Sequence, residues 1–225
     1  MTEHFGDRDS TPPAAGHDAP PADLAESMRL IAAGRAAAAR RLQPDPRLIF
    51  WPWAFSWIIS FGLYFLHYGP GGRVFVDLPG WVPGATLAAT LVGAGVVAGL
   101  AGARAYRHVF GNSSIRGAMY GWTWLLGYLA MGVILGRITP DLPAPEAGLL
   151  WAAAAVGVTG LLHAAGGAIW LDRNLFALGA WITVTNLAGV LAGPGWHSLV
   201  TAVAGGGGLL VAGLLAWRRW RAVTA

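Results

Sequence analysis

Four polar side chains lie inside long apolar stretches of the sequence, and their types and spacing could support chemistry. Thr159 and His163 are four positions apart in one stretch. Thr183 and Asn186 are three positions apart in the next. Residues at these spacings share a helix face, so packing of the two helices would form an intramembrane polar cluster that coordinates a small polar substrate or shuttles a proton. The preferred alternative is interhelical hydrogen bonding that only holds the helices together.

A run of four glycines near the centre of the last apolar stretch is the second candidate. Its members are Gly205, Gly206, Gly207 and Gly208. Each glycine destabilises a helix interior by about 1 kcal/mol relative to alanine, so the run needs a physical reason. Either it marks a hinge or a broken helix that lines a site, or it lets a neighbouring helix approach closely. Close packing is the preferred interpretation.

Motifs for soluble catalysis are missing. Cysteine and lysine are both absent, and neither HExxH nor GxSxG occurs, which excludes thiolate chemistry and a Walker lysine. Apart from His163, no Asp, Glu, Arg or His lies deep within an apolar stretch, and His67 and His197 fall at outer ends. A proton pump with a carboxylate relay is therefore not expected. The sequence predicts a protein that is not an enzyme and has no catalytic, metal-binding or cofactor-binding residues.

The elements that carry these residues are predicted to be membrane-spanning helices. Of the 225 residues, 55% are hydrophobic and 12% are charged, which is typical of a membrane protein. About 20 residues are needed for a helix to cross the hydrocarbon core. Runs of this length occur at 48–67, 84–103, 117–136, 148–170, 175–193 and 197–217. They are continuous rather than alternating, which favours an all-α bundle of six transmembrane helices over a β-barrel.

The arginines predict the orientation of these helices. Eleven of them flank the spans on one side, and only Arg73 and Arg137 fall in the opposite connections. By the positive-inside rule, both termini are then cytoplasmic and the spans form three in–out–in hairpins in the plasma membrane. The frame GR-x-x-x-DLP occurs twice, at 72–79 and 136–143, and both copies are predicted in outward turns. Duplication of a hairpin and convergent turn chemistry both explain the repeat.

The segment before the first span is predicted to have two parts, with the six-helix domain following at 47–221. Residues 1–22 are rich in proline and small residues and are expected to be disordered. Residues 23–46 are expected to form a cytoplasmic amphipathic helix and a linker, with Asp23 as the N-terminal cap and Glu26 completing a capping box. This helix could lie on an anionic membrane surface, bind a cytoplasmic protein through residues 23–42, or be merely solvated.

Two stretches carry a resemblance to a known group of proteins. They are ARRLQPDPRLIFWPWAFSWIISFG at 39–62 and GPGWHSLVTAVAGGGG at 193–208. With them the chain resembles uncharacterised actinobacterial multipass membrane proteins that are often labelled only "transporter". The resemblance implies an integral membrane protein and brings no catalytic residues with it.

Two functions stay open at this point. The first is a transporter-like, permease-like protein of unknown substrate that has no ATPase of its own. The second is a membrane sensor or scaffold that recruits a cytoplasmic regulator through its N-terminal helix. The expected partners are the lipid bilayer, a second copy of the chain and a cytoplasmic protein. Nucleic acid is not expected, because the arginines sit beside spans.

Overall fold

The computed structural model describes residues 23–42, 44–107 and 111–224, and every element in these ranges is helical. In chain order the elements are α1 (Leu24–Leu42), α2 (Pro46–His67), η1 (Pro70–Gly72), α3 (Val82–Tyr106), α4 (Asn112–Ile138), η2 (Thr139–Asp141), α5 (Ala144–Trp170), α6 (Arg173–Ala192), α7 (Trp196–Val200), the π-helix η3 (Thr201–Gly206) and α8 (Gly207–Thr224). Six helical segments among the described residues are long and apolar enough to cross a membrane. The chain is therefore an all-α, multi-pass integral membrane protein, as its composition predicts.

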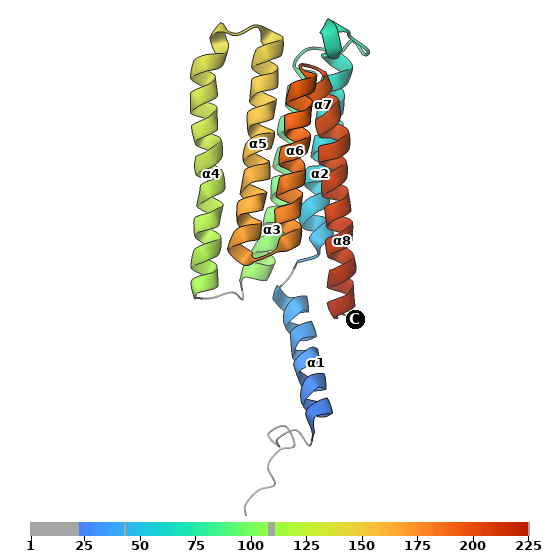
Figure 1. The fold of residues 1–225 in the computed structure, drawn as a ribbon, viewed down its shortest axis with the longest axis vertical. Coiled ribbons are helices and arrows are strands. Elements are labelled where there is room, and N and C mark those ends of the chain that lie inside the picture. Colours follow the sequence, from blue (N-terminus) through green and yellow to red (C-terminus); the bar gives the residue numbers. More distant parts are fainter. Residues whose placement is uncertain (1–22, 43, 108–110, 225) are drawn as a thin grey trace, which may run out of the picture.

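The six spans are arranged as three antiparallel hairpins (Figure 1). The connections after α2, α4 and α6 lie at one end of the bundle, and α1 and the end of α8 lie at the other. Both GR-x-x-x-DLP frames, at 72–79 and 136–143, therefore fall at the same end, which confirms the predicted hairpin pattern. The assignment of the α1 end to the cytoplasm stays a prediction from the arginines.

The core lies between α2, α5, α6 and the sixth span, while α3 packs against α2 and α4 packs against α5. Its buried residues include Ala54 and Trp57 from α2, Val156 from α5, Ile182 from α6 and Leu209 from α8. Large apolar side chains along α3 and α4 are exposed, as expected for faces that contact lipid tails. The polar side chains buried in the core therefore come mainly from α2, α5, α6 and the sixth span.

Glycines bring α5 and α6 into backbone contact. A Cβ atom placed on Gly160 would lie 2.5 Å from Thr183 Oγ1, and one placed on Gly179 would lie 2.6 Å from the Gly160 carbonyl oxygen. Neither distance leaves room for a methyl group. This close approach is the membrane form of small-residue packing, in which van der Waals contact replaces the hydrophobic effect between helices.

The sixth span is one continuous helix that contains a π-helical segment. The sequence predicts one uninterrupted apolar run at 197–217, and the structure has a span at Trp196–Ala222 that consists of the short α7, the π-helix η3 and α8. The glycine run falls at the boundary, with Gly205 and Gly206 in η3 and Gly207 and Gly208 in α8. Single-turn π segments are frequent at functional sites, so η3 directs attention to the side chains around it.

Aromatic donors join several helices by bonding to backbone carbonyls of their neighbours. The indole N–H of Trp181 on α6 donates to the Ala204 carbonyl at 2.9 Å, and that of Trp51 on α2 donates to the Leu210 carbonyl at 3.3 Å. The Tyr120 hydroxyl of α4 donates to the Leu162 carbonyl of α5. Tryptophan side chains within the spans thus act in interhelical packing.

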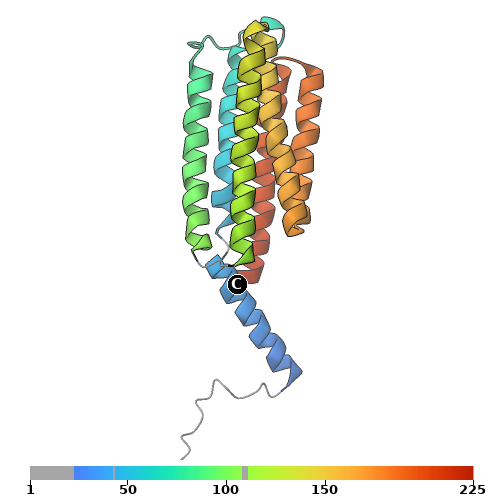
Figure 2. The same cartoon turned by 90° about the vertical axis from the view of Figure 1, so that its left-hand side faces the viewer.

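Helix α1 leaves the bundle at its lower end (Figure 2). Its N-terminus is capped as predicted, because the backbone N–H of Glu26 donates to Asp23 Oδ1 at 2.7 Å. The next helix, α2, begins at Pro46, where Asp45 Oδ1 accepts from the Arg47 backbone N–H at 2.9 Å. The prediction of disorder for residues 1–22 lies outside the described residues.

Candidate functional site

The predicted cluster of four polar residues lies on two packed helices but divides into two groups. On α5, Thr159 Oγ1 bonds to the Tyr128 hydroxyl of α4 and to the Ala155 carbonyl of its own helix. His163 Nδ1 lies 2.8 Å from the Thr159 carbonyl oxygen. Its ring meets Trp124 of α4 edge to face, with centroids 5.3 Å apart. The α5 pair therefore faces α4.

The α6 pair makes different contacts. Thr183 Oγ1 donates to the Gly179 carbonyl of its own helix at 2.9 Å, a local bond that threonines in membrane helices often make. Asn186 Nδ2 donates to the Ala153 carbonyl of α5 at 2.9 Å, and its Oδ1 lies 2.8 Å from His197 Nε2 of α7. The hydrogen bonds recorded for the described residues do not join the α5 pair to the α6 pair.

His197 is the residue that the sequence interpretation missed. An outer end of a span was predicted for it, yet the structure buries it to 1% exposure between α6 and α2. Gly189 makes the room, since a Cβ atom there would lie 2.9 Å from His197 Cδ2. The only sequence signal was indirect: a glycine and an asparagine three residues apart in α6, on the face that would receive a side chain from the following turn.

The hydrogen bonds around Asn186 determine which nitrogen of His197 carries the proton. Because Nδ2 of Asn186 donates to the Ala153 carbonyl, its Oδ1 is turned toward His197 and can only accept. His197 Nε2 must therefore be the protonated, donating nitrogen. In a neutral imidazole Nδ1 is then an acceptor, and this buried atom has no hydrogen-bond partner among the described residues.

A second buried polar atom lies one turn further along. Thr201 is 2% exposed at the start of η3, and its Oγ1 also has no partner among the described residues. His197 and Thr201 are four positions apart, so they project from one face of the sixth span. Together they present an acceptor and a hydroxyl, a pair that suits a small molecule with hydrogen-bond donors. We call His197, Thr201 and Asn186 the junction site.

Aromatic and glycine residues enclose the junction site. The Phe61 ring of α2 meets the His197 ring edge to face, with centroids 6.4 Å apart. Gly205 faces Trp57, because a Cβ atom there would lie 2.9 Å from the indole ring and 3.7 Å from Thr201 Cγ2. The described surroundings therefore combine an apolar wall with two buried polar atoms that lack hydrogen-bond partners among the described residues.

Three members of the predicted glycine run pack closely against neighbouring helices. Gly206 meets Ile58 of α2 and Gly208 meets the Trp181 indole of α6, where added Cβ atoms would come within 2.6 Å and 2.5 Å of them. Gly205 meets Trp57, whereas Gly207 faces open space. Close packing thus accounts for three glycines of the run. A hinge at this position stays a prediction, to which the π-helix gives a structural basis.

A contrasting polar group lies between α2 and α3. Ser56 and Ser60 are buried and bond to Thr90 Oγ1 of α3 at 2.8 Å and 3.1 Å. Thr90 in turn donates to the Thr86 carbonyl at 2.8 Å. With two serines donating and one threonine relaying to its backbone, every hydroxyl in this α2–α3 cluster is satisfied.

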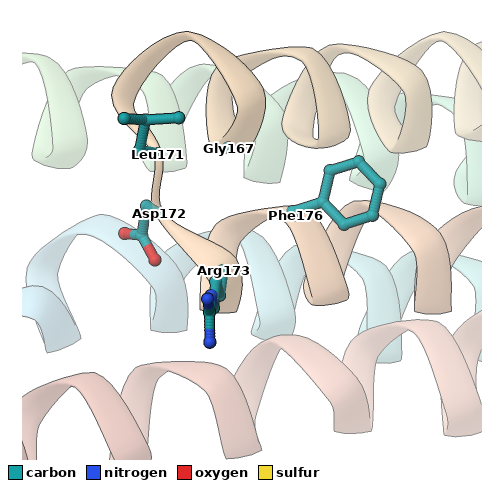
Figure 3. Close-up of a pocket in the computed structure, with 5 residues that line it drawn as sticks. All are labelled: Gly167, Leu171, Asp172, Arg173 and Phe176. Carbon is teal, nitrogen blue, oxygen red and sulfur yellow. The ribbon is translucent and has the colours of Figure 1, made fainter.

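A hollow lies at the turn between α5 and α6 (Figure 3), at the α1 end of the bundle (Figure 1). It is lined by Gly167, Leu171, Asp172, Arg173 and Phe176. Asp172 Oδ1 already accepts from the backbone N–H groups of Asn174 at 2.9 Å and Leu175 at 3.2 Å, so its carboxylate caps α6. The hollow is a product of helix capping and is a weaker candidate than the junction site.

Comparison with known proteins does not assign a function to this chain. No protein-family model matches the chain, and no match was found among the curated proteins or the solved structures. The resemblance to uncharacterised multipass proteins therefore stays a prediction.

Proposed function

We propose that this membrane protein is permease-like and moves a small polar solute past the junction site. The observation that carries the proposal is the π-helical segment of the sixth span, where α7 and η3 hold two buried polar atoms without partners among the described residues. Such π segments inside helices are frequent at functional sites. An unsatisfied buried polar atom costs about 1–3 kcal/mol, which a solute with donor groups would offset while it passes.

The chemistry of the junction site narrows the solute class. His197 Nδ1 accepts hydrogen bonds, so it favours a solute that donates them. The residues identified around it are His197, Asn186, Thr201 and aromatic rings, without an arginine that would stabilise an anion. The proposed solute is therefore a small, uncharged hydrogen-bond donor, and carboxylates and phosphates should be excluded. With no lysine in the sequence, an ATP-driven cycle would need another chain.

Transport is proposed in preference to catalysis for a geometric reason. A hydroxyl nucleophile needs a base within hydrogen-bond reach. Thr201 Oγ1 and His197 Nδ1 have no hydrogen bond to each other, although they lie on the same face of the span. The pair is thus better suited to holding a passing molecule than to activating Thr201.

Reconstituted liposomes provide the test. Purified protein is inserted into liposomes, and shrinkage and reswelling after a hyperosmotic step with urea, glycerol or acetamide are followed by light scattering. We expect at least one of these solutes to enter faster than in protein-free liposomes, and His197→Ala to reduce that rate about tenfold or more. His67→Ala is the matched control, because His67 accepts from the Leu78 backbone N–H outside the core. Entry rates equal to those of protein-free liposomes for all solutes would refute the proposal.

One observation favours the second function, a sensor or scaffold. On α1, the apolar side chains of Leu24, Met28 and Ile31 are 79%, 59% and 49% exposed and share one face. Removal of residues 1–42 separates the two functions. A permease should keep most of its flux, whereas a scaffold should lose a cytoplasmic partner detected by affinity purification and mass spectrometry. Loss of flux with an unchanged set of bound proteins would contradict both assignments of α1.

A further inference from the structure

A cluster of arginines and tryptophans lies where α2 begins and α8 ends, far from the junction site. The Trp217 ring of α8 has the Arg47 guanidinium 4.7 Å from its centroid and the Arg221 guanidinium 5.0 Å from it. Arg47 also lies 5.9 Å from the Trp51 ring. Two cationic side chains thus share one aromatic ring at the edge of the membrane span, a position where tryptophan favours the headgroup region.

The carboxylate of Asp45, at the start of α2, is already hydrogen-bonded to Arg47. Asp45 accepts from Arg47 Nη2 at 2.7 Å and from Arg47 Nε at 3.1 Å and 3.2 Å, and it also caps the backbone of α2. These bonds hold the pKa of Asp45 below its usual value, so the carboxylate stays charged. Asp45 therefore balances Arg47 and leaves the positive charge of the α8 end in place.

The end of α8 adds further positive charge. Arg218 and Arg219 are exposed, and the structure records no ion pair for either of them among the described residues. With Arg221, three arginines occupy four consecutive positions beside Trp217. Arg218 and Arg219 therefore present positive charge to an anion at the membrane surface.

The platform beneath these charges is rigid. Gly213 of α8 packs against α2, since a Cβ atom there would lie 2.7 Å from the Trp51 ring and 3.0 Å from Phe50 Cβ. The Trp51 indole is fixed by its bond to the Leu210 carbonyl. The guanidinium groups are therefore presented on a preformed corner and can bind a planar or tetrahedral oxyanion without reorganising the helices.

We propose that the corner formed by Trp217, Arg218 and Arg221, beside the Arg47–Asp45 ion pair, binds the phosphate of an anionic phospholipid headgroup. The phosphate contacts the guanidinium groups while the acyl chains lie along the exposed apolar sides of the helices. A zwitterionic headgroup also carries a phosphate, but its ammonium group is repelled by the same arginines. The site therefore selects an anionic lipid over a zwitterionic one.

Native mass spectrometry of the full chain, with phosphatidylglycerol or phosphatidylcholine added at matched concentrations, tests the proposal. The wild type should bind phosphatidylglycerol preferentially. Each arginine near a headgroup contributes roughly 1 kcal/mol, equivalent to about a fivefold change in affinity. Arg221→Gln should therefore weaken phosphatidylglycerol binding about fivefold, and Arg218→Gln/Arg221→Gln about 25-fold.

Controls separate this site from general charge effects. Arg73→Gln is matched, because Arg73 also lies over an aromatic ring, Phe75 at 6.0 Å, but at the opposite end of the bundle. It should leave the preference unchanged. Arg221→Lys, which keeps the charge, should retain more binding than Arg221→Gln and guards against a folding defect.

Three results would overturn the proposal. They are equal binding of the two lipids to the wild type, an unchanged preference in the double variant, and loss of the preference when inorganic phosphate is added at millimolar concentration. The last result would assign the corner to free phosphate rather than to a lipid. None of these outcomes bears on solute flux at the junction site, so the two proposals can fail separately.

Discussion

The α2–α3 cluster and the junction site are both buried polar groups between helices, but they differ in how completely they are hydrogen-bonded. Ser56, Ser60 and Thr90 bond to one another and to backbone, so the cluster is closed. In the junction site Asn186 is satisfied on both sides, yet His197 Nδ1 and Thr201 Oγ1 have no partner among the described residues.

The difference teaches which polar residues in a membrane core deserve functional interest. Closed hydrogen bonds between membrane helices contribute about 0.6 kcal/mol each on average and act in packing. Open polar atoms destabilise the fold, and their presence calls for a compensating role such as binding. Buried polar side chains occur in both regions, so their presence does not identify a functional site. Incomplete hydrogen bonding distinguishes the junction site from the α2–α3 cluster.

The largest expected effect comes from Asn186→Leu, which would leave a further polar atom of the junction site without a hydrogen-bond partner. It removes the partner of His197 Nε2, which leaves a buried donor unsatisfied, and it removes the second bond of the Ala153 carbonyl, which keeps its bond within α5. We expect the free energy of unfolding to fall by about 2–4 kcal/mol. Thermal unfolding in detergent, followed by tryptophan fluorescence, measures the loss. A loss below that of Ser60→Ala would contradict the importance of this bridge.

Ser60→Ala tests the closed region and should have a smaller effect. The change removes one hydroxyl donor to Thr90, which keeps its bonds to Ser56 and to the Thr86 carbonyl. We expect a loss of about 0.5–1.5 kcal/mol. Solute entry into liposomes should be unchanged, because every hydroxyl of the α2–α3 cluster already has a hydrogen-bond partner. Reduced entry in this variant would show that the two regions do not differ in function.

Thr201→Val separates stability from transport at the junction site. Valine has nearly the shape of threonine and removes a hydroxyl that lacks a partner among the described residues, so stability should change by less than about 1 kcal/mol, with stabilisation as the expected direction. Solute entry should nevertheless fall, since the hydroxyl is a proposed contact. A variant that is clearly destabilised would reveal a hydrogen bond at Thr201 and make the junction site resemble the closed cluster.

The smallest effect is expected at the Asp45–Arg47 pair, which extends the comparison to a polar pair at the edge of the bundle. The Arg47 hydrogen bonds lower the pKa of Asp45 below 3.8 in the folded state. Its stabilisation is therefore present above the unfolded pKa and lost as pH falls through the folded pKa. Between about pH 6 and about pH 3, wild type should lose up to about 1 kcal/mol more than Asp45→Asn. Parallel pH profiles of the two proteins would contradict this.

The apolar runs, the distribution of the arginines and the spacing of Asp23 and Glu26 were sufficient to predict the spans, the hairpins and the cap at Asp23, because each of these depends on local sequence. The contacts of the predicted polar residues were not predictable in the same way. Helices that are apolar on all sides do not show which face meets a neighbour, so Thr159 turned out to bond Tyr128 and Asn186 to bond His197.

The junction site depends on features that the pattern of residue types does not encode. His197 enters the core because Gly189 leaves space opposite it, a relation between residues on different helices. The π-helix at Thr201–Gly206 adds a residue to one turn and changes which side chains point inward. The glycine run indicated the right position, but only the packing of Gly206 and Gly208 against neighbours distinguishes its members.

The aromatic bonds to backbone carbonyls affect how freely the sequence can vary. Trp51, Trp181 and Tyr120 bond to the carbonyls of Leu210, Ala204 and Leu162, groups that every residue type supplies. Substitutions at the acceptor positions can therefore preserve these links as long as the new side chain fits. The three donor side chains cannot be replaced in this way. At each of these contacts, helix pairing therefore depends on the identity of the donor residue and not on that of the acceptor residue.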